Sequence, residues 1–289
     1  MEILMNYAFQ IIALGTALLA AVAAPVGALS VYKGQSLIGD AIGHATFPGV
    51  VLAFMAFSTR SPAVLLVGAM AAAAVTFFAI QAAHENTRVG LNANLAVFLS
   101  GFFGLGMVLK SFIQGNEAYR GASQAGLETY IFGQAAYMLE ADVKLIAFVA
   151  ALCAALLFAF YKELKVFVFD AEYARAVGLP VRLLQVLLPF LTIAVIGIGI
   201  KAVGAILISS FLIIPCVAAS QWSDDFAHVL FLSAVFGVVA ALAGTYVSTL
   251  EQGMSTGPSI ILAASAIAFL SMFFGKRGAF RKRGRREEA

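Results

Sequence analysis

The chain has 289 residues, of which 62% are hydrophobic and only 11% are charged. Average soluble domains carry about 25% charged residues, so this composition excludes an ordinary soluble protein. Its formal net charge of +3 is small, and no nucleic-acid partner is expected. Several apolar runs exceed the ~18 residues that mark a spanning helix, and none alternates like a lipid-facing β-strand. The predicted fold class is therefore all-α, a polytopic membrane helical bundle.

Nine apolar runs are long enough to cross a membrane, and we predict one spanning helix for each. The sixth and seventh are separated only by Lys201 and Ala202, so they form either a tight hairpin or one broken helix. No basic region precedes the first run, which we therefore interpret as a retained span. The spans are approximately Phe9–Val31, Ser36–Phe57, Ala63–Ala83, Asn92–Phe112, Val143–Tyr161, Leu183–Ile200, Val203–Ser220, Ala227–Leu250 and Pro258–Phe274.

The second run carries two ionisable residues, Asp40 and His44, four positions apart. That spacing places both side chains on one face of a helix. A centrally placed Asp costs roughly 2.5–3.5 kcal/mol on insertion, so it needs a partner or a water-filled cavity. A carboxylate and an imidazole suit several divalent transition metals, which predicts a cation or proton path. The alternative is a structural Asp–His hydrogen bond.

A long loop, about 162–182, follows the fifth span. Asp170 is a favourable N-cap, Gly178 is a typical residue for the position just after a helix, and Pro180 ends helical structure. These signals predict a short helix over Ala171–Val177. Such a helix is either a rigid docking element or an ordinary connector.

The distribution of Lys and Arg predicts the orientation. With the basic tail, 276–289, in the cytoplasm, thirteen of the eighteen basic residues fall on the inner side of a nine-span chain. Loops facing the cytoplasm are normally enriched in Lys and Arg. We therefore expect an external N-terminus, a transmembrane domain over 1–275, and a cytoplasmic loop at 162–182. Lipid is the expected surrounding of the spans.

The sequence has no G-x-x-x-x-G-K-[ST] phosphate loop, no H-E-x-x-H zinc-protease motif and no G-x-S-x-G nucleophile turn. The chain is therefore expected to be a transport protein and not an enzyme. If transport uses ATP, a separate subunit must hydrolyse it.

Four segments closely resemble one known family, the membrane permease subunits of bacterial zinc/manganese/iron ABC importers. They fall in order across most of the chain, and together they are highly specific. The segments are SLIGDAIGHATFPGVVLAF (Ser36–Phe54), FDAEYARAVGLPVRLLQ (Phe169–Gln185), VGAILISSFLIIPCVAA (Val203–Ala219) and TGPSIIL (Thr256–Leu262).

The resemblance implies a type II ABC importer permease in the bacterial cytoplasmic membrane. It implies a dimer with a second copy or a paralogue, cytoplasmic ATPase subunits that use ATP, and an extracytoplasmic metal-binding protein. No permanently bound cofactor is expected; manganese, zinc or iron would be the transported ion.

The family's metal-handling Asp and His match Asp40 and His44. Its ATPase-docking helix matches the segment that carries Asp170, Glu172, Arg175 and Gly178. Gly43 and Thr46–Phe47 depart from the common pattern, which bears on the shape of the metal cavity.

Two rival functions remain open from the sequence. A proton-coupled secondary transporter would use Asp40 and His44 as a proton relay. A related ABC permease for an iron chelate or a vitamin would carry a substrate too large for these two ligands. ATP dependence separates the first rival from the metal importer, and competition by free metal ions separates the second.

Overall fold

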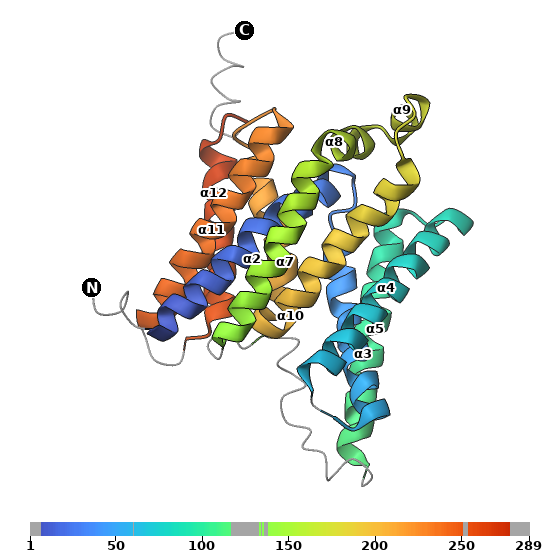
Figure 1. The fold of residues 1–289 in the computed structure, drawn as a ribbon, viewed down its shortest axis with the longest axis vertical. Coiled ribbons are helices and arrows are strands. Elements are labelled where there is room, and N and C mark those ends of the chain that lie inside the picture. Colours follow the sequence, from blue (N-terminus) through green and yellow to red (C-terminus); the bar gives the residue numbers. More distant parts are fainter. Residues whose placement is uncertain are drawn as a thin grey trace.

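The computed structural model describes residues 7–59, 61–116, 133, 135, 138–250 and 254–277, and within them all regular structure is helical. Figure 1 shows how the helices are arranged. They are α2 (Tyr7–Tyr32), α3 (Ile38–Phe57), α4 (Pro62–Asn86), α5 (Leu91–Gly115), α7 (Glu140–Ala159), α8 (Tyr161–Phe169), α9 (Ala171–Ala176), α10 (Val181–Ala219), α11 (Phe226–Leu250) and α12 (Thr256–Phe274). The described residues contain nine helical stretches that are long and apolar enough to span a membrane, which confirms the predicted bundle.

α10 contains two of these stretches, Val181–Ile200 and Ala202–Ala219, joined by a sharp turn. Gly204 has φ 80° and ψ 166°, a conformation that strongly favours glycine. A β carbon on Gly199 would lie only 2.7 Å from Ile208 Cδ1. Nine residues of straight helix would separate these positions by about 13 Å, so the chain folds back at this point. The two short spans therefore form the tight hairpin.

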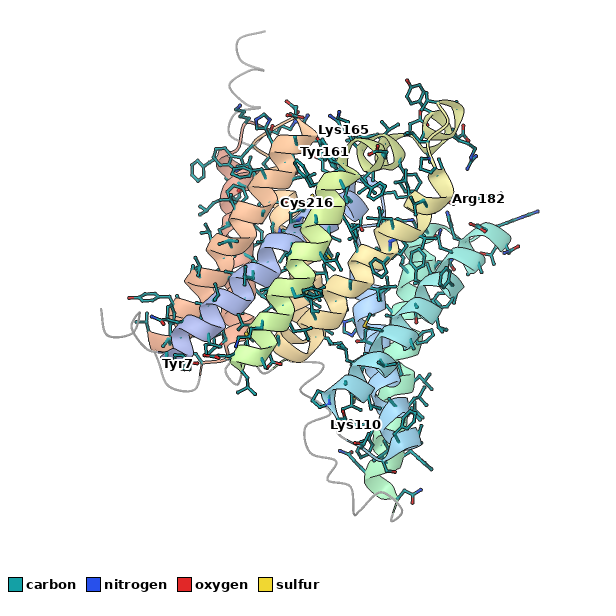
Figure 2. The ribbon with its side chains drawn as sticks, in the orientation of Figure 1. Tyr7, Lys110, Tyr161, Lys165, Arg182 and Cys216 are labelled. Atoms are coloured by element: carbon teal, nitrogen blue, oxygen red, sulfur yellow. The ribbon has the colours of Figure 1, made fainter. Side chains whose placement is uncertain are left out.

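The two ends of the bundle carry different elements (Figure 1). α8 and α9 lie at one end, which we call the coupling end. Tyr7, at the start of α2, lies at the opposite end from Lys165 on α8 (Figure 2). There the Tyr7 hydroxyl donates a hydrogen bond to Glu140 at the start of α7. The described spans that run from Tyr7 to α8 are α2, α3, α4, α5 and α7, an odd number, which puts Tyr7 and α8 at opposite ends of the bundle. The positive-inside pattern predicts that the coupling end is cytoplasmic.

Small residues let the helices pack closely. α2 packs against α10, α11 and α7, while α3 packs against α4, α5 and α10. A β carbon on Gly27 would lie 1.9 Å from the carbonyl oxygen of Leu212 in the second arm of α10. Between helices in lipid there is no hydrophobic driving force, so close packing of this kind supplies much of the association energy. α10 thereby connects the group formed by α2, α7, α11 and α12 to the group formed by α3, α4 and α5.

Most of the predicted tail, 276–289, lies outside the described residues. At its start, the backbone N–H of Arg277 donates to Gln221 O at 3.1 Å. The Arg277 guanidinium also pairs with Asp224, in the turn between α10 and α11. These contacts hold the end of α12 beside that turn at the coupling end.

Candidate metal site and coupling segment

Asp40 and His44 lie near the start of α3, with Asp40 in its first turn. His44 Nε2 lies 3.5 Å from Asp40 Oδ1, so the structure brings the two predicted side chains together. The Asp40 side chain is 29% exposed and the His44 side chain 18% exposed in the isolated chain. The positive end of the helix dipole stabilises negative charge in the first turn. Because both side chains are partly exposed, a solute or a second protein chain can reach a carboxylate and an imidazole that lie side by side.

The surroundings of the pair are set by neighbouring helices. The ring of Phe103, on α5, lies edge-on to the His44 ring with the centroids 5.2 Å apart. A β carbon on Gly43 would meet only ordinary contacts with α10, at 3.8 Å or more. Thr46 is buried and its hydroxyl donates to the Gly43 carbonyl, and Phe47 is fully buried. Thr46 and Phe47 therefore contribute to the packing of α3, and the Gly43 position faces α10.

Among the described residues, Asp40 and His44 alone could supply only part of a metal coordination shell. No group of three or more His, Cys, Asp or Glu side chains able to share an ion occurs among the described residues. Divalent transition metals normally take four to six ligands. If Asp40 and His44 bind such an ion, the remaining ligands must come from water, backbone carbonyls or another chain.

The predicted docking helix is present as α9, which ends one residue earlier than expected. Asp170 caps its N-terminus, because its Oδ1 accepts a 2.8 Å hydrogen bond from the Tyr173 N–H. Gly178 follows the helix with φ 79° and so completes the expected stop. Glu172 and Arg175 are both exposed on α9. The four residues predicted for coupling thus lie on one short, capped element at the coupling end.

The structure adds an apolar surface that the sequence analysis missed. Phe169, Tyr173 and Val177 are 56%, 58% and 51% exposed. All three belong to the short segment that runs from the end of α8 to the residue after α9. Large apolar side chains exposed together beyond a membrane-spanning bundle are typical of a contact surface for another protein.

Helix α8 was also missed, because the fifth span was expected to run on to Tyr161 and lead into a loop. Leu164, Phe167 and Val168 are its buried residues. Their spacing of three and four is a helical signal within the sequence KELKVFVF. α8 lies at the coupling end (Figure 1) and leads directly into α9.

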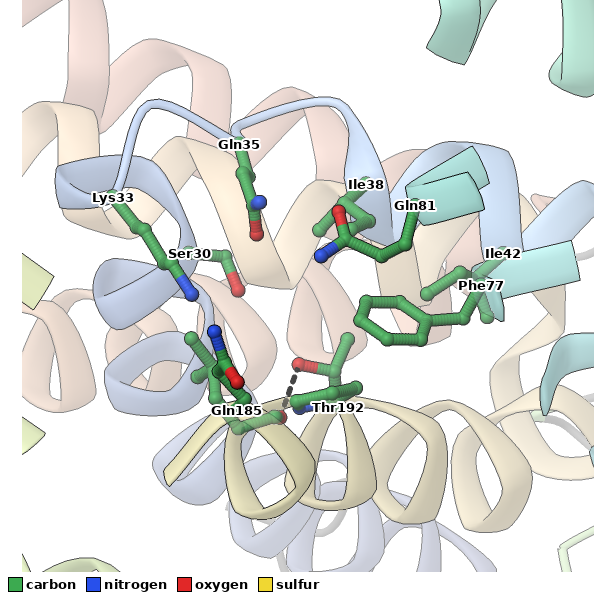
Figure 3. Close-up of a pocket in the computed structure, with 11 residues that line it drawn as sticks. Ser30, Lys33, Gln35, Ile38, Ile42, Phe77, Gln81, Gln185 and Thr192 are labelled. Atoms are coloured by element: carbon green, nitrogen blue, oxygen red, sulfur yellow. Dashed lines mark hydrogen bonds between the residues drawn. The ribbon is translucent and has the colours of Figure 1, made fainter. Parts of the chain in front are cut away.

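A small polar cavity of about 40 Å³ lies between α2, α3, α4 and the first arm of α10. Figure 3 shows Lys33, Gln35, Gln81 and Gln185 directed towards its interior, with the Thr192 hydroxyl bonded to its own helix. Gln81 Oε1 is buried and accepts no hydrogen bond from the described residues. Burial lowers the pKa of the Lys33 amine from 10.5 to about 8. The cavity is large enough for a few water molecules.

Comparison with known proteins places the chain in a family. The sequence profile of the ABC 3 transport family matches residues 5–275. The manganese transport system membrane protein MntC of Bacillus subtilis is 37% identical over 265 residues, which are 91% of this chain. This chain spans only 60% of the length of that relative.

Two further similarities cover nearly the full length of both proteins. The zinc transport system membrane protein TroC of Treponema pallidum is 35% identical over 275 residues, covering 95% of this chain and 91% of TroC. The solved structure of PsaBC from Streptococcus pneumoniae in complex with Fab matches with a TM-score of 0.82 and 26% identity, covering 96% of each chain. These findings confirm the resemblance seen in the four segments: the chain belongs to the ABC 3 transport family and is a multi-pass protein of the cytoplasmic membrane.

Proposed function

We propose that this chain is the permease of an ATP-driven importer for a divalent transition metal, and that Asp40 and His44 are ligands the ion meets on its way across. Family membership supports the transport role. The observation that carries the assignment of residues is the 3.5 Å separation of His44 Nε2 and Asp40 Oδ1.

That separation fits a shared metal ion. Zinc lies about 2.0–2.2 Å from nitrogen and oxygen ligands, so two ligand atoms on a tetrahedral ion are about 3.4 Å apart. The observed distance therefore lets an ion enter between Nε2 and Oδ1 with little movement of either side chain. A direct hydrogen bond between the same atoms would be shorter, near 2.7–3.0 Å.

Partial exposure and an incomplete ligand set point to a second permease chain facing the pair. A dimer, of two copies or with a paralogue, would bring further ligands to the ion and close the site against lipid. A site with few protein ligands also releases its ion readily, which conduction requires.

The energy source is proposed to be a separate ATPase docked on α9. Asp170, Glu172, Arg175 and Gly178 would form the docking element, together with the exposed Phe169, Tyr173 and Val177. An extracytoplasmic metal-binding protein would deliver the ion to the opposite end. Hydrolysis of ATP is assigned to the partner subunit, and this chain carries the ion.

The ion is proposed to be manganese, zinc or iron. The relatives MntC and TroC are named for manganese and for zinc. One carboxylate and one imidazole suit each of these divalent metals, so the pair itself does not select among them.

The test is ATP-dependent uptake of radiolabelled Mn²⁺, Zn²⁺ and Fe²⁺ by the complete transporter, normalised to the amount of permease in the membrane. Asp40→Asn and His44→Ala should each abolish uptake while the protein stays in the membrane. His84→Ala, at an exposed histidine near the end of α4, is the matched control and should transport normally.

Two results would contradict the proposal. Near-normal uptake by both variants would reduce the pair to a structural hydrogen bond. Uptake that persists without ATP but stops when a protonophore collapses the proton gradient would favour a secondary transporter instead.

A further inference from the structure

The end of α2 contacts α8 and α11 through a cluster of four aromatic rings and one amine. The Lys33 amine lies 3.9 Å from the centroid of the Phe167 ring on α8. Tyr32 lies edge-on to Phe169, at 5.6 Å between centroids, and to Phe226 of α11, at 5.2 Å. Phe169 and Phe226 also contact each other at 5.3 Å. Phe169 immediately precedes Asp170, the N-cap of α9, so this aromatic cluster adjoins the proposed docking helix.

The same end of α2 is tightly connected to α3. The Gln35 N–H donates to Ser30 O at 2.9 Å and the Gly34 N–H to Val31 O at 3.0 Å. Gly34 has φ 76°, so this is a Schellman-type end to the helix. The Ile38 N–H then donates to Gln35 O at 3.0 Å, and α3 begins. This short hydrogen-bonded turn therefore connects Lys33 directly to the first turn of α3, where Asp40 lies.

The Lys33 side chain lies between the Phe167 ring and the polar cavity. It lines the polar cavity, which holds the unpaired Gln81 Oε1 on the opposite wall (Figure 3). An ammonium group is attracted to the face of an aromatic ring, and it also donates hydrogen bonds to amide oxygens. Exchange of one such partner for the other would give this charged side chain two arrangements, and elements with two arrangements are those through which distant sites are coupled.

We propose that Lys33 is a positioning residue that couples α8 to α3, its amine held on the Phe167 ring in the observed state and drawn from the ring to Gln81 across the cavity in a second state. The inference rests on the proposed function, since it assigns a route by which the ATPase-docking segment controls the helix that carries Asp40 and His44. The aromatic contacts of Tyr32 keep α2, α8 and α11 together while Lys33 changes partner.

The experiment measures metal ions transported per ATP hydrolysed by the complete transporter in proteoliposomes, with radiolabelled Mn²⁺ or Zn²⁺, whichever the unmodified protein carries. Lys33→Gln and Phe167→Leu should each lower this ratio about tenfold, because each removes the cation–π contact. The double variant should fall no further than the single variants, because both changes break the same interaction. Lys33→Arg keeps a cation over the ring and should retain most of the ratio.

One control and one further variant separate coupling from loss of structure. Lys162→Gln removes an exposed charge from α8, the helix that carries Phe167, and should leave the ratio unchanged. Gln81→Leu removes the acceptor in the cavity and should lower the ratio, as Lys33→Gln does. A ratio unaffected by Lys33→Gln, or a double variant whose loss equals the product of the two single losses, would overturn the inference. Failure of the proposed function looks different, since the unmodified protein would then show no ATP-dependent uptake of either metal.

Discussion

Gly49 of α3 and Gly68 of α4 cross so closely that a β carbon on Gly49 would lie 2.3 Å from the carbonyl oxygen of Gly68. No side chain fits between the two backbones at this point. Contact at this distance fixes the position of α3 relative to α4, and with it the position of Asp40 and His44 on α3. The placement of the candidate metal site therefore depends on packing well away from the two ligands.

We expect Gly49→Ala to destabilise the protein by about 1–3 kcal/mol, the usual cost of forcing an extra carbon into a tightly packed site. The measurement is thermal unfolding of the purified permease in detergent. Gly43→Ser is the matched control on the same helix, because a β carbon there meets nothing nearer than 3.8 Å. Equal unfolding temperatures for the two variants would show that α3 and α4 separate easily at this crossing.

The Asp40–His44 geometry predicts that position matters as much as charge. Asp40→Glu keeps the negative charge but moves the carboxylate by one methylene, about 1.5 Å, away from the observed 3.5 Å relation to His44 Nε2. We expect uptake by this variant to fall at least about tenfold, towards the level of Asp40→Asn. Full uptake by Asp40→Glu with none by Asp40→Asn would instead indicate a general electrostatic role.

Local signals in the sequence were sufficient for much of this structure. Runs of apolar residues determine spanning helices because unpaired backbone groups are too costly in lipid. Asp170 and Gly178 delimit α9 because capping involves residues only a few positions apart. Asp40 and His44 face the same way for the same local reason, their spacing of four on one helix.

Contacts between distant segments could not be predicted in this way. Lys33 and Phe167 meet only because α2 and α8 pack together, and nothing near either residue in the sequence indicates the other. The short separation of the sixth and seventh spans at Lys201 and Ala202 left a tight hairpin and a broken helix both open, because packing between helices decides which forms. The exposure of Phe169, Tyr173 and Val177 was likewise not predicted, because it depends on where α8 and α9 lie.

The orientation can be tested with introduced cysteines, after Cys153 and Cys216, both buried, are replaced by alanine. Ser61→Cys, just before α4, should react with an impermeant thiol reagent in intact spheroplasts. Asn86→Cys, at the other end of α4, should react only after lysis. The opposite pattern would invert the topology that the positive-inside count predicts.

Lys33 should make coupling sensitive to pH. Burial lowers its pKa to about 8, below the ordinary 10.5, so the folded protein binds fewer protons than the unfolded chain between these values. The free energy of unfolding therefore increases as the pH rises from about 8 to 10.5. The cation–π contact, in contrast, is lost as the amine deprotonates. Metal transported per ATP should fall between pH 7 and pH 9, roughly one unit either side of that pKa.

The control for this pH effect is Lys33→Arg, since the guanidinium stays protonated over the whole range. Its ratio of transported metal to hydrolysed ATP should not show the fall attributed to Lys33. Identical pH profiles for the two proteins would assign the effect to other groups, such as the transported ion's own ligands.

The α9 surface leads to a last prediction, on recognition of the ATPase. Tyr173 is 58% exposed between Phe169 and Val177, so Tyr173→Ser removes the centre of an apolar contact. Buried aromatic anchors often contribute 2 kcal/mol or more to an interface, so binding should weaken by at least about tenfold. Arg175→Glu reverses a charge beside the same surface and should act in the same direction. Gly178→Val should also weaken binding, because valine is strained at φ 79° and would distort the end of α9.

The measurement is the amount of ATPase that co-purifies with each tagged permease. Arg88→Glu, an equivalent reversal in the exposed turn between α4 and α5, should bind the ATPase normally. Normal co-purification of all three α9 variants would show that the helix is only a connector.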